Sequence, residues 1–266
     1  MNRILTLTTD FGARDAYVAS MKGVILGMVP EARLVDITHT IDAFDVMEAA
    51  YILRNAVEFF PAGTVHLAVV DPGVGSGRRP VAVRSGDRWF VGPDNGLFSL
   101  VLTGQRVDER VVLDRPAFWR TPTPSATFHG RDVFAPVAAH ILRGTPLGEL
   151  GTPIEALKPL HWALPIDDQQ GIQGWVVHVD RFGNGITNIT RTLFEDRRRG
   201  RAVKCYVGST ILAHVACTYT DAPGGEPLML FDSSDHLEIA VNTGNASELL
   251  GIRKGAPVNV VFLEDR

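Results

Sequence analysis

The run Val65-His66-Leu67-Ala68-Val69-Val70 leads directly into Asp71. Its apolar side chains are nearly continuous, which is typical of a strand that is covered on both faces of a sheet. A second apolar run, Ile4–Thr9, ends in the same way at Asp10. Short apolar runs within residues 81–91 are close enough in sequence to form an antiparallel pair. Strands of this kind, separated by amphipathic stretches, predict a layered α/β domain at the N-terminal end.

The stretches between the apolar runs have the residue spacing of helices. One helix is expected from about Tyr17 to Met28, with Asp15 as its N-cap. Another opens with Asp45 and Glu48, which have the spacing of a capping box. A third is expected over about residues 132–143. The alternation of strands and helices supports the α/β class.

Beyond about Gly171 the helical periodicity fades, and short apolar runs alternate with turn residues. This spacing is typical of a small β-barrel or sandwich. The expected strands are Trp175–Val179, Val203–Val207, Leu228–Phe231, Leu237–Val241 and Val258–Phe262. The sequence therefore predicts an α/β domain over 1–165, a linker within 164–170 and a β-barrel domain over 171–266.

Composition limits the classes of partner. The 266 residues carry a formal net charge of −4, which favours neither a nucleic acid nor an anionic membrane. The one basic run, 197–201, is expected to be a solvated loop. No apolar run approaches the ~20 residues that span a bilayer, and charge comes too early, at Asp10, for a signal peptide. Two cysteines without a CxxC pair fit a reducing cytoplasm.

Three polar residues stand where strands end or helices begin. Asp10 and Asp71 directly follow expected strands, and ligands of open α/β sheets bind beyond the carboxyl ends of strands. The alternative is that each acid caps a helix or a turn. His129 stands at an expected helix entrance, where it is either a site residue or a structural histidine.

A glycine-rich segment, residues 72–77, follows Asp71. It matches neither the P-loop nor the dinucleotide-binding pattern, so its glycines are better explained by a tight turn beside a ligand. Asp10, Asp71, His129 and Asp132 also leave a metal site open, although no HExxH or His-x-His pattern supports one.

In the second half of the chain, residues 180–188 combine an aromatic ring with amide and glycine residues. Phe182 is suited to stacking on a purine, and Asn184 offers a donor and an acceptor to the purine edge. A plain hairpin turn is the alternative.

Seven segments, in this order, resemble the S-adenosylmethionine hydroxide adenosyltransferase family, whose relatives include fluorinating and chlorinating enzymes. The segments are Leu7–Gly12, Val35–His39, Val69–Arg79, Gly92–Phe98, Phe128–Asp132, Phe182–Asn184 and Leu237–Asn242. The likeness covers nearly the whole chain. It implies an N-terminal α/β domain, a C-terminal β-barrel and a homotrimer. In that trimer, adenosine sites form where the N-domain of one subunit meets the C-domain of a neighbour.

The resemblance also implies residue roles. In the family, an Asp, an Arg and a His hold the attacking water, and these correspond to Asp71, Arg78 and His129, with Arg79 as the alternative arginine. The carboxylate that binds the ribose corresponds to Asp10. Further contacts to the nucleoside or the methionine are expected from Asp180, Phe182, Asn184, Ser233, Glu238 and Val241.

Halogenating relatives differ from this chain at the expected site. They carry Tyr in place of Asp71 and of His129, and the fluorinating ones carry a halide-holding serine in place of Gly130. Asp71 would repel an anion, so the resemblance favours water as the nucleophile. Asp235 departs from the family pattern, in which glycine commonly follows two serines, and this puts the contacts of Ser233 and Ser234 in question.

The expected reaction is hydrolysis of S-adenosyl-L-methionine to adenosine and L-methionine, by in-line SN2 attack of an activated water on the ribose C5′. Either His129 or Asp71 is expected to accept the proton of the water. The reaction needs no metal and no redox cofactor. The alternatives are a metal-dependent nucleoside or phosphoester hydrolase, a non-catalytic adenosine-binding module and a residual halide transferase.

Overall fold

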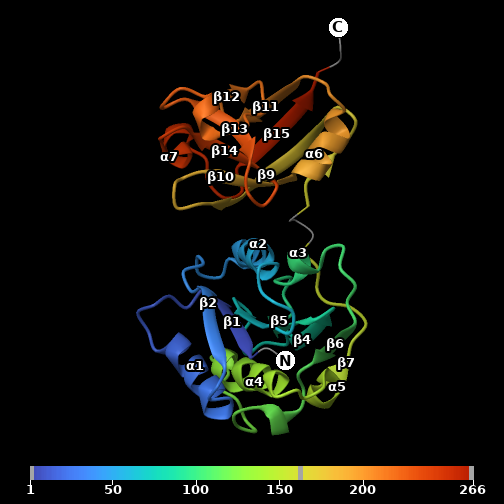
Figure 1. Cartoon of the computed structure of the whole chain (residues 1–266). Coiled ribbons are helices and arrows are strands. Elements are labelled where there is room, and N and C mark those ends of the chain that lie inside the picture. Colours follow the sequence, from blue (N-terminus) through green and yellow to red (C-terminus); the bar gives the residue numbers. More distant parts are fainter. Residues whose placement is uncertain (1–2, 161–163, 264–266) are drawn as a thin grey trace. The chain divides into compact units, whose positions relative to one another are not determined.

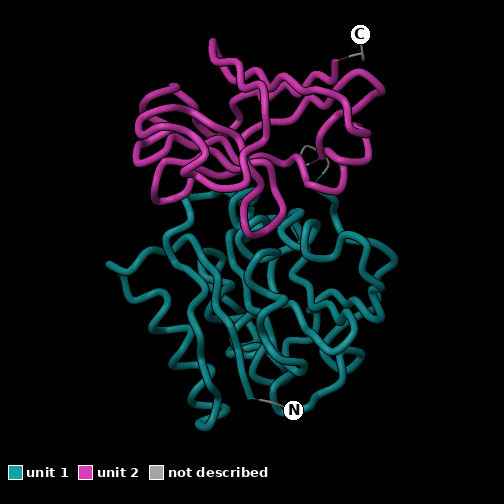
Figure 2. Tube along the Cα trace, turned by 45° about the horizontal axis from the view of Figure 1, so that its top comes forward, with its two compact units in different colours: residues 1–160 teal, residues 161–266 magenta. Residues whose placement is uncertain are grey.

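The computed structural model describes residues 3–160 and 164–263 (Figure 1). The chain divides into two compact units, residues 1–160 and 161–266 (Figure 2). Each unit has a hydrophobic core of its own. The structure thus confirms the predicted class, an N-terminal α/β unit and a C-terminal barrel.

The first unit is built on a seven-stranded sheet in the order β2-β1-β3-β5-β4-β6-β7. Strands β2, β1, β3 and β5 are parallel, whereas β4 is antiparallel to β5, as the short runs within 81–91 predicted. The strands are β1 Ile4–Thr9, β2 Arg33–Thr38, β3 Val65–Val69, β4 Pro80–Ser85, β5 Arg88–Pro93, β6 Glu109–Val112 and β7 Thr152–Pro153.

Helices cover both faces of this sheet (Figure 1). They are α1 Tyr17–Met28, α2 Val46–Val57, α3 Ser99–Leu102, α4 Ala135–Leu142 and α5 Leu147–Leu150. Leu67 and Val69 of β3 pack in the cluster that includes α1 and α4, whereas Ala68 and Val70 pack in the cluster that includes α2. Because successive side chains of a strand point to opposite faces, burial on both sides explains the continuous apolar run.

The N-termini of the helices can be compared with the N-cap residues that the sequence predicted. Asp45 is the N-cap of α2, and its side chain accepts a 2.8 Å hydrogen bond from the backbone N of Glu48, as predicted. The prediction of Asp15 as a cap is wrong, because α1 has Ala16 at its N-cap and no side-chain cap bond. The expected third helix begins earlier, as a π-helical turn over Gly130–Phe134 that continues into α4.

The strand order explains where a ligand can bind. Strand β1 lies between β2 and β3, and the connections α1 and α2 pack in the clusters on opposite faces of the sheet. A crevice therefore opens at the carboxyl ends of β1 and β3, which is a topological switch point. Asp10 and Asp71 follow these two strand ends.

The second unit is an eight-stranded sheet in the order β12-β11-β15-β9-β10-β14-β13, with β8 paired to β9. A bridge between Val215 and Met229, and a 2.8 Å hydrogen bond from the N of Ala216 to the O of Met229, nearly close it into a barrel. The strands are β8 Ile166–Asp167, β9 Gly171–Val179, β10 Gly185–Thr190, β11 Val203–Val207, β12 Thr210–Leu212, β13 Pro227–Phe231, β14 His236–Val241 and β15 Pro257–Phe262. The five predicted strands are confirmed.

In the described part of the second unit, two α-helices accompany the barrel, α6 Arg191–Arg198 and α7 Ala246–Leu250. The prediction of a solvated loop at 197–201 is wrong at its start, because Arg197 and Arg198 form the last turn of α6. This helix is capped by the Thr190 side chain, which accepts a hydrogen bond from the N of Leu193. Within the described residues, no helix has the length and apolar character needed to cross a membrane.

Candidate active site

A cavity of about 360 Å³ opens in the first unit, at the carboxyl ends of β1 and β3. Its lining residues come from four segments that are far apart in the sequence. They are Asp10, Phe11, Tyr17, Ala43, Phe44, Val69, Asp71, Val74, Thr127, Phe128, His129 and Gly130. The crevice that the strand order predicts is thus a real cavity.

A hydrogen-bonded chain of three side chains lies at this cavity. The Arg78 guanidinium donates to both carboxylate oxygens of Asp71, with its Nε 2.9 Å from each and its Nη2 in an ion pair with Oδ2. The same Nη2 lies 3.0 Å from Nδ1 of His129. The side chains of Arg78 and Asp71 are only 9% and 5% exposed, so their opposite charges are held together away from bulk water.

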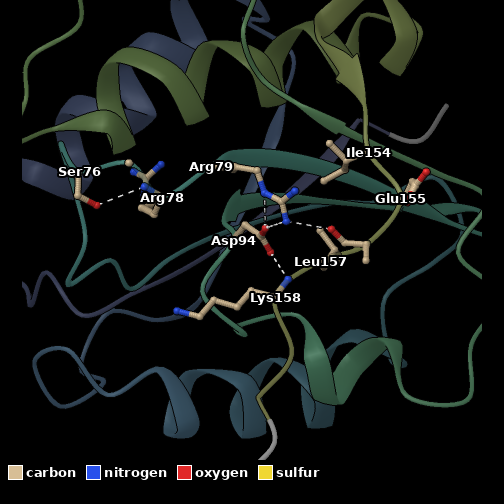
Figure 3. Close-up of a pocket in the computed structure, with 10 residues that line it drawn as sticks. Ser76, Arg78, Arg79, Asp94, Ile154, Glu155, Leu157 and Lys158 are labelled. Carbon is tan, nitrogen blue, oxygen red and sulfur yellow. Dashed lines mark hydrogen bonds and ion pairs between the residues drawn. The ribbon is translucent and has the colours of Figure 1, made fainter.

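The structure separates the two neighbouring arginines (Figure 3). Arg78 is hydrogen-bonded to Asp71 and His129. Arg79 is paired with the buried carboxylate of Asp94, as Figure 3 shows, and donates to the O of Ala156 at 2.9 Å. Successive side chains of an extended chain point to opposite sides, and this places the two guanidinium groups in different surroundings. Arg78 is therefore the arginine of the candidate site.

The glycine-rich segment positions Arg78 by packing its backbone against the segment that carries His129. Gly75 has φ +72°, and a Cβ built on it would lie 2.3 Å from the O of Ala126. Only glycine accepts both the left-handed conformation and this close approach. The segment is therefore a tight turn beside a cavity, in agreement with the expectation from sequence.

We expect Gly75→Ala to lower turnover by between about tenfold and a hundredfold, because the turn must move away from Ala126 and carry Arg78 with it. Steady-state kinetics measure the loss. The matched control is Gly77→Ala in the same turn, where φ is not left-handed and a Cβ would meet nothing within 4 Å. Equal activity of the two variants would contradict a role for the Gly75 contact.

His129 has a defined protonation pattern in this arrangement. Burial lowers the pKa of His129 below its usual value, the Arg78 charge lowers it further, and the charges of Asp71 and Asp132 oppose both. Because a guanidinium only donates, the Nδ1 that faces Arg78 must accept. Neutral His129 therefore carries its proton on Nε2.

Asp10 is held beside an exposed aromatic ring. Its Oδ2 accepts a 2.9 Å hydrogen bond from the N of Phe44, and burial, with a contribution from the Asp71 charge, raises the pKa of Asp10. Phe44 has φ +71° and is 67% exposed although it lines the cavity. A left-handed, exposed phenylalanine is costly, and such strain is common at ligand sites. No motif in the sequence indicated Phe44.

Aromatic rings form one wall of the cavity. Phe128 makes edge contacts with Phe11 and Tyr17, at centroid distances of 5.9 and 5.1 Å. Gly130 lies against this wall, where a Cβ would be 3.1 Å from Sδ of Met21 and 3.3 Å from the Phe128 ring. A side chain at position 130 would therefore have to displace the wall.

The remaining predicted residues lie in the second unit. Asp180 accepts hydrogen bonds from the N of Phe182, the N of Asn184 and the side-chain amide of Asn184, so the 180–184 turn is held by its own acid. Phe182 is 74% exposed. Glu238 is buried, accepts from the Tyr219 hydroxyl at 2.9 Å, and has its pKa raised to about 7, first by burial and then by the charges of Asp180 and Asp232.

Two predicted residues of this unit lie apart from the 180–184 turn in the sequence. Ser233 is exposed in the turn between β13 and β14. Val241, at the end of β14, has its side chain in the hydrophobic core. Of the predicted residues, the structure thus brings Asp10, Asp71 and His129 to one cavity, and Arg78 is hydrogen-bonded to the last two.

The geometry does not favour a metal site at this cavity. In residues 3–160 and 164–263, the acidic and histidine groups whose ligand atoms come within 4.8 Å of one another are Asp42, Asp45 and Glu48. Asp10, Asp71 and His129 do not form such a group. Asp45 caps α2 through the N of Glu48, so this acidic group has a structural explanation.

Family models match both units. The model described as SAM hydroxide adenosyltransferase N-terminal domain matches residues 5–151, and the model of the C-terminal domain of the same family matches residues 174–259.

Named relatives cover nearly the whole chain. A protein of Salinispora arenicola named (R)-S-adenosyl-L-methionine hydrolase is 40% identical over 96% of this chain and 97% of its own length. One of Thermus thermophilus with the same name is 41% identical, over 95% and 97%. A fluorinase of an Actinoplanes species is 26% identical, over 97% of both chains. The crystal structure of an uncharacterized conserved protein from Thermotoga maritima superposes with a TM-score of 0.88 at 37% identity, over 97% of this chain and 99% of that one.

Proposed function

The chain belongs to the SAM hydroxide adenosyltransferase family, and we propose that it hydrolyses (R)-S-adenosyl-L-methionine to adenosine and L-methionine. The observation that carries this function is the hydrogen-bonded set of side chains Asp71, Arg78 and His129, at a cavity beyond the carboxyl ends of the strands. Asp71 and His129 offer an acceptor and a donor to one small polar molecule, and their positions suit a water.

Water is a better nucleophile for this cavity than a halide. The Asp71 carboxylate lies at the cavity and would repel an anion. The tight packing around Gly130 leaves no room for an added hydroxyl donor without movement of Phe128 or Met21. A fluoride or chloride would therefore meet a negative charge without a new donor to offset it.

The geometry also distinguishes the base from the orienting group. Nδ1 of His129 accepts from Arg78, and Nε2 carries the ring proton, so neutral His129 has no free lone pair for a water proton. Asp71 retains lone pairs beyond those that Arg78 occupies. We assign proton acceptance to Asp71 and orientation of the water oxygen to the Nε2–H of His129.

The reaction then proceeds in one displacement. The water oxygen forms a bond to C5′ as the C5′–S bond breaks, and the bonding pair leaves with sulfur. The sulfonium becomes a neutral thioether, so methionine needs no protonation to leave. The water proton passes to Asp71. Holding the water in line with the C–S bond is the main contribution of the site, because it converts a slow encounter into an intramolecular step.

Binding of the substrate is assigned to both units. Asp10 accepts hydrogen bonds from the ribose hydroxyls. Phe182 and Asn184 contact the adenine, and Asp180, Ser233 and Glu238 lie at the nucleoside or the methionine. Val241, whose side chain packs in the core, would meet the substrate only through its backbone. In a homotrimer, each site would take the binding residues of the second unit from a neighbouring subunit. Light scattering, which measures the mass of the assembly, tests for the trimer.

The two free cysteines, Cys205 and Cys217, fit a cytoplasmic protein.

The decisive experiment is incubation of the metal-free chain with S-adenosyl-L-methionine in oxygen-18 water. We expect adenosine labelled at its 5′ oxygen, with an equal amount of methionine, by mass spectrometry. Activity that returns only with a divalent metal would favour the metal-dependent hydrolase. A 5′-halo product on addition of chloride or fluoride would favour the halide transferase. Tight adenosine binding without turnover would favour the binding module.

A further inference from the structure

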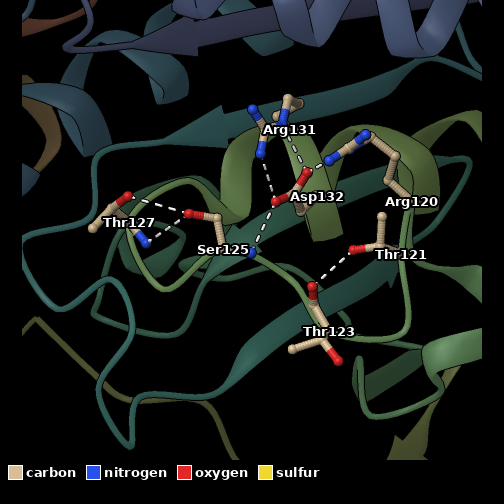
Figure 4. Close-up of polar contacts among 7 residues, drawn as sticks. All are labelled: Arg120, Thr121, Thr123, Ser125, Thr127, Arg131 and Asp132. Atoms are coloured by element: carbon tan, nitrogen blue, oxygen red, sulfur yellow. Dashed lines mark hydrogen bonds and ion pairs between the residues drawn. The ribbon is translucent and has the colours of Figure 1, made fainter.

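The mechanism above does not use Asp132, the most completely engaged carboxylate near the cavity (Figure 4). Its side chain is 1% exposed. Oδ1 accepts from Nε of Arg120 at 2.6 Å and from Nε of Arg131 at 2.7 Å. Oδ2 accepts from Nη2 of Arg131 at 2.8 Å and from the N of Ser125 at 2.9 Å. The Arg131 bonds, with those from Arg120 and Ser125, hold the pKa of Asp132 well below its usual range, so it stays ionised.

These bonds close the segment that carries His129 into a loop. Ser125 stands before His129 and Asp132 after it, so the bond between them fixes both ends of the 125–132 turn. The N of Arg120 also donates to the O of Asp132 at 2.9 Å, and the N of Asp132 donates to the O of Phe128 at 3.2 Å. A single buried carboxylate thus joins both ends of the turn.

The His129 ring depends on this turn for its position. Within the described parts of the chain, its one side-chain hydrogen bond is to Arg78. The backbone at residue 129 sets the direction of the Cα–Cβ bond and the rotamers that the ring can adopt, so the bond to Arg78 forms only where the turn places this backbone correctly. The backbone beside His129 is held chiefly through Asp132.

The same carboxylate supports the aromatic wall. Arg131, which Asp132 binds through two nitrogens, stacks over the Phe128 ring at 4.9 Å. Phe128 in turn contacts Phe11 and Tyr17. A change at Asp132 would therefore act on His129 first, through the turn, and on the wall second, through Arg131.

We infer that Asp132 is a positioning residue, which sets the His129 ring against Arg78 and Asp71 through the 125–132 turn. This role rests on the proposed function. Asp132 does not touch the reacting atoms. The charged groups that act on His129 are Arg78, Asp71 and Asp132, and loss of the Asp132 charge leaves the burial and the Arg78 charge less opposed.

The test is Asp132→Asn in the full-length chain. We expect kcat to fall between about tenfold and a hundredfold, with a smaller change in KM, because the substrate groups remain while the water is misplaced. The pKa of His129, followed by NMR with carbon-13 histidine, should move further below that of the wild type. His129→Gln identifies its resonance among the eight histidines.

The matched control is Asp108→Asn. Asp108 also accepts from a backbone N, that of Gly86 at 2.7 Å, and pairs with an arginine, Arg106, but it lies at the far end of β4 from the cavity. Its loss should leave kcat and the His129 titration unchanged. If Asp132→Asn does not fold by circular dichroism, Arg120→Gln replaces it, because the Arg120 side chain is 43% exposed. This variant should lower kcat about threefold to tenfold.

The positioning role would be overturned if Asp132→Asn kept the kcat and the His129 titration of the wild type. Where Arg120→Gln replaces this variant, a wild-type kcat in Arg120→Gln would overturn it. The NMR titration needs no substrate. Absence of adenosine formation by the wild type would therefore overturn the proposed function alone, and an unchanged His129 titration in Asp132→Asn would still count against the role of Asp132.

Discussion

Asp71→Asn is expected to lower kcat by roughly a thousandfold, since the substitution removes the group to which the water proton is transferred. It also removes the charge that binds the Arg78 guanidinium through Nε and Nη2. The amide keeps the size of the side chain, so the cavity and the substrate contacts should persist. KM and the affinity for adenosine should change far less than kcat.

The matched control for this variant is Asp94→Asn. Asp94 is also a nearly buried carboxylate, and it pairs with the neighbouring arginine, Arg79, on the other side of the same segment. Its replacement perturbs an equivalent ion pair away from the cavity, so kcat should remain within about tenfold of the wild type. A loss in Asp94→Asn as large as that in Asp71→Asn would mean that the segment is merely destabilised. A loss in Asp71→Asn of less than tenfold would remove Asp71 as the base.

Much of the first unit could be predicted because its physics is local. The run 65–70 is apolar at every position but one, and its burial on both faces follows from that fact alone. Asp45 caps α2 through the side-chain bond that its spacing from Glu48 indicated. Asp10 and Asp71 meet because parallel strands place their carboxyl ends along one edge of a sheet. Here sequence pattern and topology agree.

What the sequence left open or missed depends on conformation rather than composition. Arg78 and Arg79 are adjacent and chemically identical, and only the direction of each side chain assigns one to Asp71 and the other to Asp94. Phe44 enters the site through a left-handed backbone that sterics disfavour for phenylalanine, so no propensity would indicate it. The arginine-rich end of α6 was misread because a polar helix has no apolar stripe to reveal its period.

The last prediction separates orientation from proton transfer at His129. The amide nitrogen of glutamine can take the place of Nε2 as a donor, but it does not titrate. If His129 orients the water, His129→Gln should lose only about tenfold in kcat, whereas His129→Leu, which has no donor, should lose between a hundredfold and a thousandfold. The pH dependence gives an independent readout. Protonated His129 carries a proton on Nδ1 and cannot accept from Arg78, so activity should fall as the pH drops through the pKa of His129.

That pKa lies below the ordinary value because of burial and the Arg78 charge, so the fall should occur on the acid side of about pH 6.5. His129→Gln should lack it, because the neutral form is then permanent. The measurement is kcat against pH for the wild type and both variants, with adenosine followed by chromatography. Equal losses in His129→Gln and His129→Leu, as severe as in Asp71→Asn, would make His129 the base. The bond from Arg78 to Nδ1 would then have to break during each turnover, which would leave Asp71 to hold the guanidinium alone.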